Sequence, residues 1–321
     1  MKKGSLFLLG TLLAIQNALG GDWQVITSPN GTKTVNELHG VSAVSDNDAW
    51  AVGVSYNTER TLSSSLIEHW NGSQWSVIPS PNPSATLNIL SAVAAVSTND
   101  VWAVGFAPTS SGSILILHWN GAAWSVTPNP ISPMTLTNLA ALAVISANDV
   151  WAVGTGLIGD EDATATLHWD GSIWSVVPSP NVGPEVDNTL AGVAAVASND
   201  VWTVGFSGFG TLAEHWNGTS WSVVDTPDVS GGEALFLDSV VALSTTNVWA
   251  VGEFFQTRKS RSRTLTDLWN GSSWAVVASP NVGSSHNELF GVAATPSQTL
   301  WAVGTVYQYP KQRTLIERRL P

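Results

Sequence analysis

Residues 190–227 read LAGVAAVASNDVWTVGFSGFGTLAEHWNGTSWSVVDTP, and this stretch is one copy of a repeat. The repeat occurs six times, and each copy carries a tryptophan in its second apolar run. These tryptophans are 52, 49, 51, 47 and 52 residues apart, at Trp50, Trp102, Trp151, Trp202, Trp249 and Trp301. Self-similarity at a period of about 50 residues is typical of architectures in which each repeat is one small structural unit.

Each copy contains four short apolar runs separated by turn signals. In the quoted copy these runs are residues 190–196, 201–205, 211–216 and 221–224. Aliphatic, β-branched and tryptophan residues dominate them, and none is long enough for a stable helix, so we predict four β-strands. Asn-Gly or Asp-Gly stands between the third and fourth runs, and these pairs are a strong signal for a tight hairpin.

A ring of such sheets explains how each one buries both of its faces. Four antiparallel strands form a small twisted sheet that is not stable alone, whereas a β-propeller packs several of them around one axis. Every run of the fourth type, including the one at residues 23–29, ends at a proline. This suits an outermost strand, because proline there discourages pairing with other chains. The sequence therefore predicts an all-β, six-bladed β-propeller with four antiparallel strands per blade.

The two ends of the chain complement each other. The last copy, residues 289–321, has three strands and no W-S-V-V run, whereas residues 23–29 (WQVITSP) read as a fourth strand with no first three before it. We therefore expect one domain, residues 21–321. Its sixth blade would combine residues 289–321 with the strand 23–29, so that the N-terminal strand closes the ring.

Residues 1–20 have the pattern of a secretory signal peptide. Two lysines precede an apolar run from Leu6 to Ile15, and small residues near Gly20 suit cleavage before Gly21. That run is about half of the roughly 20 apolar residues that a spanning helix needs. We expect a secreted or cell-envelope protein with no membrane span.

The composition excludes several classes of function. The formal charge is −12, and it becomes −14 from Gly21 onward because the first twenty residues hold two of the 12 basic and none of the 24 acidic residues. Such an acidic chain is a poor partner for DNA or RNA. The chain has no cysteine, which excludes disulfides, Cys-based metal sites and thiol nucleophiles. We expect no cofactor and a monomer whose partner is a glycan or an extracellular protein.

The units N-D-V-W-A-V-G, H-W-N-G and W-S-V-V-P-S-P-N resemble those of secreted bacterial β-propellers. More distantly, the chain is similar to kelch, sialidase-type and two-component-regulator propellers. The resemblance covers residues 21–321 and implies the propeller fold. Paired glycines of the kelch type do not recur, and the S-x-N-D-x-W turn lacks the glycine of an Asp-box. Six-bladed fucose-binding lectins share the blade count, but their Arg, Glu and Trp pattern is not visible, so no site residue is carried over.

Four copies share two polar residues. One is a histidine directly before the tryptophan that ends the third strand. The other is an aspartate two residues before the second-strand tryptophan, which we call the anchor tryptophan. In copies five and six both are replaced together, by Asn247 with Leu268 and by Thr299 with Arg318. We interpret this as one structural hydrogen bond per blade, because a metal site would need several imidazoles to converge. The predicted pairs are Asp48–His69, Asp100–His118, Asp149–His168 and Asp200–His215.

The remaining recurrent residues give no catalytic site. All 17 tryptophans fall on fixed repeat positions, and we interpret them as packing between blades. No G-x-S-x-G elbow, H-E-x-x-H pair or phosphate-binding loop occurs. Asp160, Glu161 and Asp162 form the densest acidic cluster, which we interpret as a solvated loop; the sequence leaves open whether a metal ion binds there or in the central channel. We assign no catalytic residue and favour a protein that is not an enzyme.

The second and fourth connections vary in length and content, and strand order places both on one face of the disc. Variable loops on a rigid frame commonly carry binding sites. Seven of the ten basic residues after Gly20 lie in second connections, at Arg60, Arg258, Lys259, Arg261, Arg263, Lys311 and Arg313. All three tyrosines lie there too, with two phenylalanines. The residue after the leading leucine of each first strand should face the channel mouth, and the distinctive ones are His39, Asp238 and Phe290.

These residues concentrate in blades five, six and one, which are neighbours in the ring. The predicted ligand-binding residues are His39, Tyr56, Arg60, Asp238, Phe254, Phe255, Arg258, Arg261, Phe290, Tyr307, Tyr309, Lys311 and Arg313. Aromatic rings would stack on sugars, basic groups would bind carboxylates or sulfates, and Asp238 and His39 would bind hydroxyls. We thus favour an extracellular module that binds a glycan or a cell-envelope polymer. The alternatives are a solvated basic surface, a protein-binding scaffold and a carbohydrate-active enzyme, whose mark would be two facing carboxylates.

Overall fold

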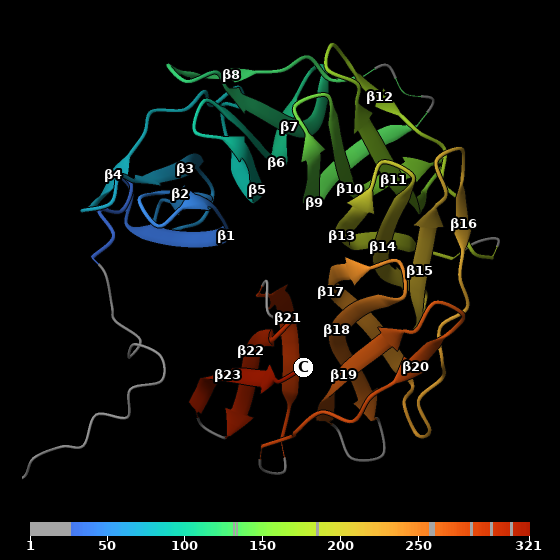
Figure 1. Cartoon of the computed structure of the whole chain (residues 1–321). Helices are drawn as coiled ribbons and strands as arrows, with labels where there is room; N and C mark the ends of the chain where they lie inside the picture. Colours follow the sequence, from blue (N-terminus) through green and yellow to red (C-terminus); the bar gives the residue numbers. More distant parts are fainter. Residues whose placement is uncertain are drawn as a thin grey trace, which may run out of the picture.

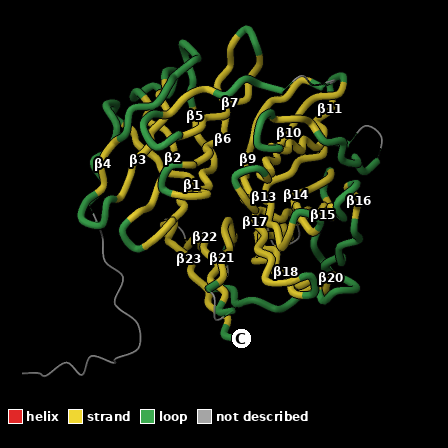
Figure 2. The backbone as a smooth tube through the Cα atoms, turned by 45° about the horizontal axis from the view of Figure 1, so that its top comes forward, coloured by secondary structure: helices red, strands yellow, loops and turns green. Residues whose placement is uncertain are grey.

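The computed structural model describes residues 27–130, 132, 134–183, 186–256, 261–282, 285–295, 298–308 and 311–321. Its strands form six antiparallel sheets around a common axis, which confirms the predicted six-bladed β-propeller (Figure 1). The first strand of each blade faces the centre of the disc and the last lies at the rim (Figures 1 and 2). Five sheets have four strands, and the sixth has three among the described residues.

The strands follow the order of the chain within each blade. Blade 1 is β1 (Val35–Ser45), β2 (Asp48–Tyr56), β3 (Ser63–Trp70) and β4 (Trp75–Val77). Blade 2 is β5 (Ile89–Ser97), β6 (Asp100–Thr109), β7 (Gly112–Trp119) and β8 (Trp124–Val126), and blade 3 is β9 (Thr135–Ser146), β10 (Asp149–Ile158), β11 (Glu161–Trp169) and β12 (Trp174–Val176). Blade 4 is β13 (Asn188–Ala197), β14 (Asp200–Ser207), β15 (Gly210–Trp216) and β16 (Trp221–Val223). Blade 5 is β17 (Ala234–Ser244), β18 (Asn247–Gln256), β19 (Arg261–Trp269) and β20 (Trp274–Val276), and blade 6 is β21 (Asn287–Ala294), β22 (Leu300–Gln308) and β23 (Lys311–Arg319).

Two glycines of the repeat are required by the backbone. In blade 4, Gly218 has a φ of 94°. The side-chain oxygen of Asn217 accepts hydrogen bonds from the backbone amides of Thr219 and Ser220 in the same turn. This is the tight Asn-Gly hairpin that the sequence predicts. Gly205 lies beside a β-bulge of β13, where a Cβ atom would come within 1.9 Å of the carbonyl oxygen of Thr189. Only glycine allows the first two strands to approach this closely.

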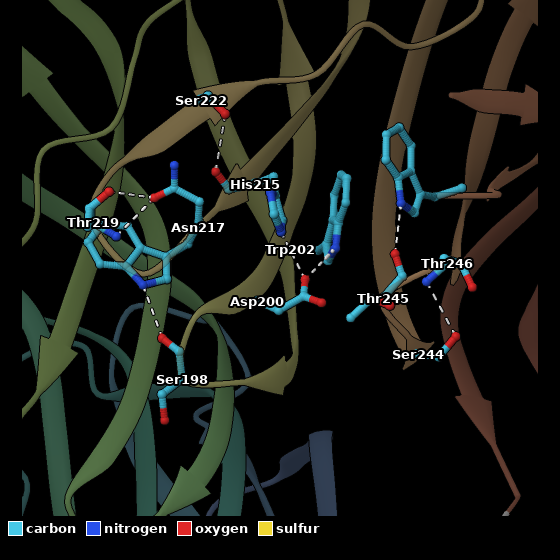
Figure 3. Close-up of polar contacts among 12 residues, drawn as sticks. Ser198, Asp200, Trp202, His215, Asn217, Thr219, Ser222, Ser244, Thr245 and Thr246 are labelled. Atoms are coloured by element: carbon cyan, nitrogen blue, oxygen red, sulfur yellow. Dashed lines mark hydrogen bonds and ion pairs between the residues drawn. The ribbon is translucent and has the colours of Figure 1, made fainter. Parts of the chain in front are cut away.

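Each Asp–His pair connects the second and third strands of its own blade. The histidine Nε2 donates to the aspartate Oδ1 at 2.8 to 2.9 Å in blades 1 to 4. In blade 4, Asp200 also accepts a hydrogen bond from the indole of Trp202, and the ring of His215 lies 4.4 Å from that indole (Figure 3). In blade 5, where the aspartate is replaced, Trp249 donates to the side-chain oxygen of Asn247 at 2.8 Å. These four histidines therefore hold strands together.

The anchor tryptophan of each of blades 1 to 4 packs against two tryptophans of the next blade. Trp102 of blade 2 lies 4.8 Å from Trp169 and 5.3 Å from Trp174 of blade 3, the second contact being edge-on at 86°. The edge-on contact recurs at the other three borders between blades 1 and 5, at 5.2 to 5.4 Å and 83 to 88°. Offset and edge-on geometries are the favourable ones for aromatic rings. Apolar cores built on these contacts join consecutive blades from 1 to 5, and a smaller one joins blades 5 and 6.

Among the described residues, none of these cores joins blade 6 to blade 1. The leading leucine of the first strand is 0% exposed in blades 2 to 6, but Leu38 of blade 1 is 47% exposed. Of the predicted closing strand, residues 27–29 alone are described, and Ser28 donates a hydrogen bond to Glu68 of blade 1 at 2.8 Å. The closing strand at residues 23–29 therefore stays a prediction.

Several borders between blades contain a carboxyl group on the third strand. The position lies two residues before the third-strand tryptophan, or before Arg319 in blade 6. In blades 1 to 6 it holds Glu68, Leu117, Leu167, Glu214, Asp267 and Glu317. Among the described residues, neither side-chain oxygen of Glu214 or Asp267 has a hydrogen-bond partner. Burial raises the pKa of Glu214 to about 8 and the pKa values of Asp267 and Glu317 to about 7.

Glu214 should make the free energy of unfolding fall as the pH rises. Its pKa in the folded protein lies above the unfolded value of about 4.3. Protonation therefore favours the folded state fully below about pH 4, and this contribution is lost as the pH rises towards 8. We expect the Glu214→Gln variant to lose less stability than the wild type between pH 5 and pH 8.5, as measured by chemical denaturation. Glu214→Leu should be more stable than the wild type at pH 8.5, since Leu167 is buried at the same position of blade 3.

Glu161→Gln is the matched control, because Glu161 is exposed on β11. This variant should keep the wild-type pH dependence. Identical pH dependence in Glu214→Gln and the wild type would contradict the assignment of a protonated carboxyl group to the border of blades 3 and 4.

The Asp–His pairs predict a compensating double substitution. His168→Leu alone leaves Asp149 without its partner and should cost about 1–3 kcal/mol of the free energy of unfolding. Adding Asp149→Asn gives blade 3 the combination found in blade 5, where the amide oxygen accepts from the anchor indole. We expect the double variant to be more stable than His168→Leu alone in a chemical denaturation series. A double variant whose loss equals or exceeds the sum of the two single losses would show that the pair is not a coupled unit.

Candidate functional site

The predicted residues of blade 1 form an ion pair that stacks on an aromatic ring. Arg60 donates to Glu37 at 2.7 Å, and its guanidinium lies 5.0 Å from the centre of the Tyr56 ring. The hydrogen bond and charge of Arg60 lower the pKa of Glu37, and Glu37 raises the pKa of Arg60 in turn. His39 donates through Nδ1 to the carbonyl oxygen of Leu90 at 2.8 Å, which ties blade 1 to blade 2. The charge of Arg60 is therefore already balanced within the protein.

Three aromatic rings meet at the border of blades 5 and 6. Phe255, near the end of β18, stacks on His286 at 6.3 Å with 17° between the ring planes. His286 meets Tyr307 of β22 edge-on at 6.4 Å, and the Tyr307 ring is exposed. The backbone amide of Ser262 donates to Nδ1 of His286 at 3.0 Å. Because Nδ1 accepts this bond, the proton of the neutral imidazole lies on Nε2. The rings thus form a continuous aromatic surface from blade 5 to blade 6.

Three carboxyl groups interact at the same border, and one of them, Glu288, shares Ser262 with His286. Glu288 of β21 accepts hydrogen bonds from Ser262 at 3.0 Å and from Thr305 at 3.4 Å. Burial, followed by the charge of Glu288, raises the pKa of Asp238 to about 6. Burial, followed by the charges of Glu288 and Asp238, raises the pKa of Glu253 to about 7. The three groups therefore interact across the border between blades 5 and 6, and two of them change protonation near neutral pH.

The residues predicted at the channel mouth lie in β-bulges. The pairing of the first two strands skips one residue at Leu38/Gly40, Leu237/Ser239 and Leu289/Gly291, which leaves His39, Asp238 and Phe290 out of register. Bulges commonly redirect a side chain in this way. The Phe290 side chain is half exposed.

Other predicted residues lie in different places from those expected. Phe254 packs against the core shared by blades 4 and 5, because it alternates with Phe255 along β18 and so faces the other side of the sheet. Arg261 and Arg263, expected in a loop, belong to β19, since the strands of this hairpin are longer than the apolar pattern indicates. Arg261 donates to Gln256 at 3.3 Å, and Arg263 donates to a backbone carbonyl at 3.3 Å.

The remaining predicted residues are only partly described. Arg258, Lys259 and Tyr309 lie outside the described residues, and Lys311 and Arg313 are described as backbone of β23. The structure brings Phe255 and Tyr307 together through His286, and it brings Tyr56 and Arg60 together on blade 1. Asp238 interacts with Glu288 and Glu253 at the border of blades 5 and 6.

Sequence reasoning missed Glu37, Glu253, Glu288 and His286. A signal was present for Glu253, because the residue after the A-V-G or T-V-G step is Val, Phe, Thr or Phe in blades 1 to 4 and Thr in blade 6. An acidic residue there departs from the repeat as clearly as Asp238 does. His286 gave no such signal, since it lies in a fourth connection that varies in every copy.

In the part of the chain that the structure describes, no group of three or more His, Asp or Glu residues could hold a metal ion. Asp162 and Glu161 belong to β11, where they pair with Leu157 and Ile158 of β10. No helix among the described residues is long and apolar enough to cross a membrane.

Comparisons with known proteins give the fold. No family model matches the chain, and the search of curated proteins found no match. Among solved structures, YCF48 bound to D1 peptide matches with a TM-score of 0.52 and 14% identity, covering 84% of this chain and 74% of that one. The six-bladed lectin of Aleuria aurantia, described with its fucose recognition mode, has a TM-score of 0.48 and 11% identity over 82% of this chain and 86% of that one. The extracellular domain of a one-component system of B. thetaiotaomicron has a TM-score of 0.45 and 11% identity over 83% and 36%. At 14% identity, the match with a TM-score of 0.52 shows a shared fold alone.

Proposed function

We propose that the protein is a non-enzymatic extracellular module that binds a glycan on the variable face of blades 5 and 6. The observation that supports this most directly is the aromatic surface of Phe255, His286 and Tyr307 beside the carboxyl groups of Asp238 and Glu253. A sugar ring has apolar C–H faces that pack on aromatic rings, and hydroxyls that need hydrogen-bond partners. Aromatic side chains with a few directed polar groups are typical of the lining of small-ligand sites.

The charges favour a neutral or amino-bearing sugar over an acidic one. Arg60 is already paired with Glu37, and the carboxyl groups of blades 5 and 6 would repel a uronate or a sulfate. We therefore propose recognition through carboxyl groups, and the expectation that Arg258, Lys311 and Arg313 bind an acidic polymer stays a prediction, since their side chains are not described. A secreted or cell-envelope location, proposed from residues 1–20, would place the site among extracellular polysaccharides.

Binding should depend on Tyr307 and Glu253. We expect Tyr307→Ala to weaken binding about tenfold, since one aromatic contact contributes on the order of 1 kcal/mol beyond its buried area. Glu253→Gln should weaken binding at pH 8 more than at pH 5, because the wild-type carboxyl group is ionised above its pKa of about 7 and is then the stronger acceptor. A glycan array and a pull-down with insoluble cell-wall polysaccharide, repeated at both pH values, measure these effects.

Phe209→Ala is the matched control. Phe209 is an exposed aromatic residue at the turn between β14 and β15 on the same face of the disc. Its removal should leave binding unchanged. Full binding by Tyr307→Ala, or equal losses in Tyr307→Ala and Phe209→Ala, would contradict a site on blades 5 and 6.

A carbohydrate-active enzyme is the second candidate, and the carboxyl groups are the reason to test it. One group with a pKa of about 7 beside another of about 6 could serve as general acid and base near neutral pH. An enzyme would release reducing ends from the bound polysaccharide, with a maximum between these two pKa values, and Glu253→Gln would abolish the release. Binding without release supports the binding module.

A further inference from the structure

The border between blades 2 and 3 carries a groove of about 640 Å³ at the rim of the disc. Its walls come from β8 and β12, the outer strands of the two blades, and from residues 127–130, which follow β8 (Figure 1). Two smaller cavities, of about 310 and 250 Å³, adjoin the same segment, and Asn129 lines all three spaces. Residues 127–130 of blade 2 are therefore the part of the chain to compare with the other blades.

Residue 127 departs from the repeat in its side chain and keeps the backbone position. Its amide donates to the third strand of its own blade at 2.9 Å, and the equivalent amides of blades 1, 3 and 4 make the same bond at 2.9 Å. In those blades the side chain is aliphatic and packs against the core shared with the next blade, at Ile78, Val177 and Val224. Blade 2 has Thr127 there, which brings a hydroxyl to the border where the other blades have a methyl group.

Asn129 stands at a position where the other four-stranded blades have a hydroxyl. That hydroxyl forms a hydrogen bond of 2.7 Å with a second hydroxyl on the third strand, and the pairs are Ser80–Ser65, Ser179–Thr164, Thr226–Thr211 and Ser279–Thr264. Blade 2 has Asn129 and Ile114 at these two positions, and isoleucine offers no hydroxyl. Within the described residues, the side chains of Thr127 and Asn129 have no hydrogen-bond partner. Both polar groups are thus available to a ligand in the groove.

The lining of the groove matches a sugar chain without charge. The described residues that line it include no Asp, Glu, Lys or Arg. The hydroxyls of Ser125 and Ser175 and the amide of Asn129 can donate and accept hydrogen bonds, as sugar hydroxyls do. Trp169 and Ile173 supply apolar surface for the C–H faces of sugars, and Ile173 is 59% exposed where the other four-stranded blades have Gln, Ala or Ser. A proline-rich peptide, which aromatic grooves also bind, offers carbonyl acceptors and almost no donors.

We propose that this groove is a second binding site of the protein and that it binds a segment of an uncharged polysaccharide. The residues that support it are independent of the aromatic surface on blades 5 and 6, and its uncharged lining contrasts with the carboxyl groups there. Blades 2 and 3 lie across the ring from blades 5 and 6 (Figure 1). One module can therefore contact two segments of a polymer at once, which raises the overall affinity above that of either site alone.

Titration with hexasaccharides tests the groove apart from blades 5 and 6. The neutral probes are cellohexaose, laminarihexaose and mannohexaose, hexagalacturonate is the charged probe, and decaproline is the peptide probe. Each is titrated calorimetrically into the full chain carrying Tyr307→Ala, which weakens the surface on blades 5 and 6. We expect at least one neutral hexamer to bind, and neither hexagalacturonate nor decaproline to bind in the groove.

Two variants in this background change the groove. Thr127→Val with Asn129→Ser introduces the residues that blade 3 has at these positions, so Tm should not fall. Binding of the neutral hexamer should weaken about tenfold or more, because two hydrogen-bond partners of the ligand are altered. Ser125→Trp fills part of the groove and should have a similar effect. Ser222→Trp on blade 4 is the matched control and should leave binding unchanged, since both serines are exposed and donate to a histidine carbonyl at 3.4 Å.

The proposal would be overturned if no neutral hexamer bound the Tyr307→Ala protein, or if decaproline bound more tightly than every hexamer. Unchanged binding in both groove variants, or an equal loss in Ser222→Trp, would overturn it as well. The surface on blades 5 and 6 is judged from a different comparison, which is the effect of Tyr307→Ala in the protein that carries Thr127→Val and Asn129→Ser. Failure of one site is therefore distinguished from failure of the other.

Discussion

The contact on which the whole ring depends is the one between an anchor tryptophan and the two outer tryptophans of the next blade. A four-stranded blade has two faces and too little core of its own to be stable. At the borders between blades 1 and 5, an indole such as Trp102 lies against Trp169 at 4.8 Å and against Trp174 at 5.3 Å, so each blade is held by its neighbour. The Asp–His bond and the Asn-Gly turn serve this contact, because they fix the strands that carry the three rings. A ring built in this way needs the same contact at its last border.

Most of the blade structure could be predicted from sequence because the same residues recur at the same positions in several copies of the repeat. A single histidine before a tryptophan would have been ambiguous, but four copies that vary together with an aspartate indicate one hydrogen bond per blade. The structure has these bonds at 2.8 to 2.9 Å. The tryptophans could be assigned to blade borders for the same reason, since a position that recurs in every copy must satisfy a requirement that every copy shares.

The candidate site was less predictable because it consists of contacts between blades. Tyr307 and Asp238 were found from their departure from the repeat, but their neighbours His286 and Glu288 come from a connection and from the beginning of a strand, where the copies differ anyway. Strand alternation was decisive for Phe254 and Phe255, and it cannot be applied until the ends of the strands are known. The prediction that the basic residues lie in loops was wrong for Arg261 and Arg263, because β18 and β19 extend beyond their apolar runs.

The border between blades 5 and 6 departs from the repeat in its frame as well as in its surface. Arg319 replaces a tryptophan beside Trp249, and among the described residues the buried core at this border has four members, fewer than the cores of the preceding borders. Fewer apolar contacts make a border easier to open locally. A ligand that spans Phe255 of blade 5 and Tyr307 of blade 6 binds the closed border and not the open one, so it stabilises the border by mass action. The residues that would recognise a ligand thus lie at a border with a smaller apolar core than those of the preceding borders, and ligand binding would strengthen that border.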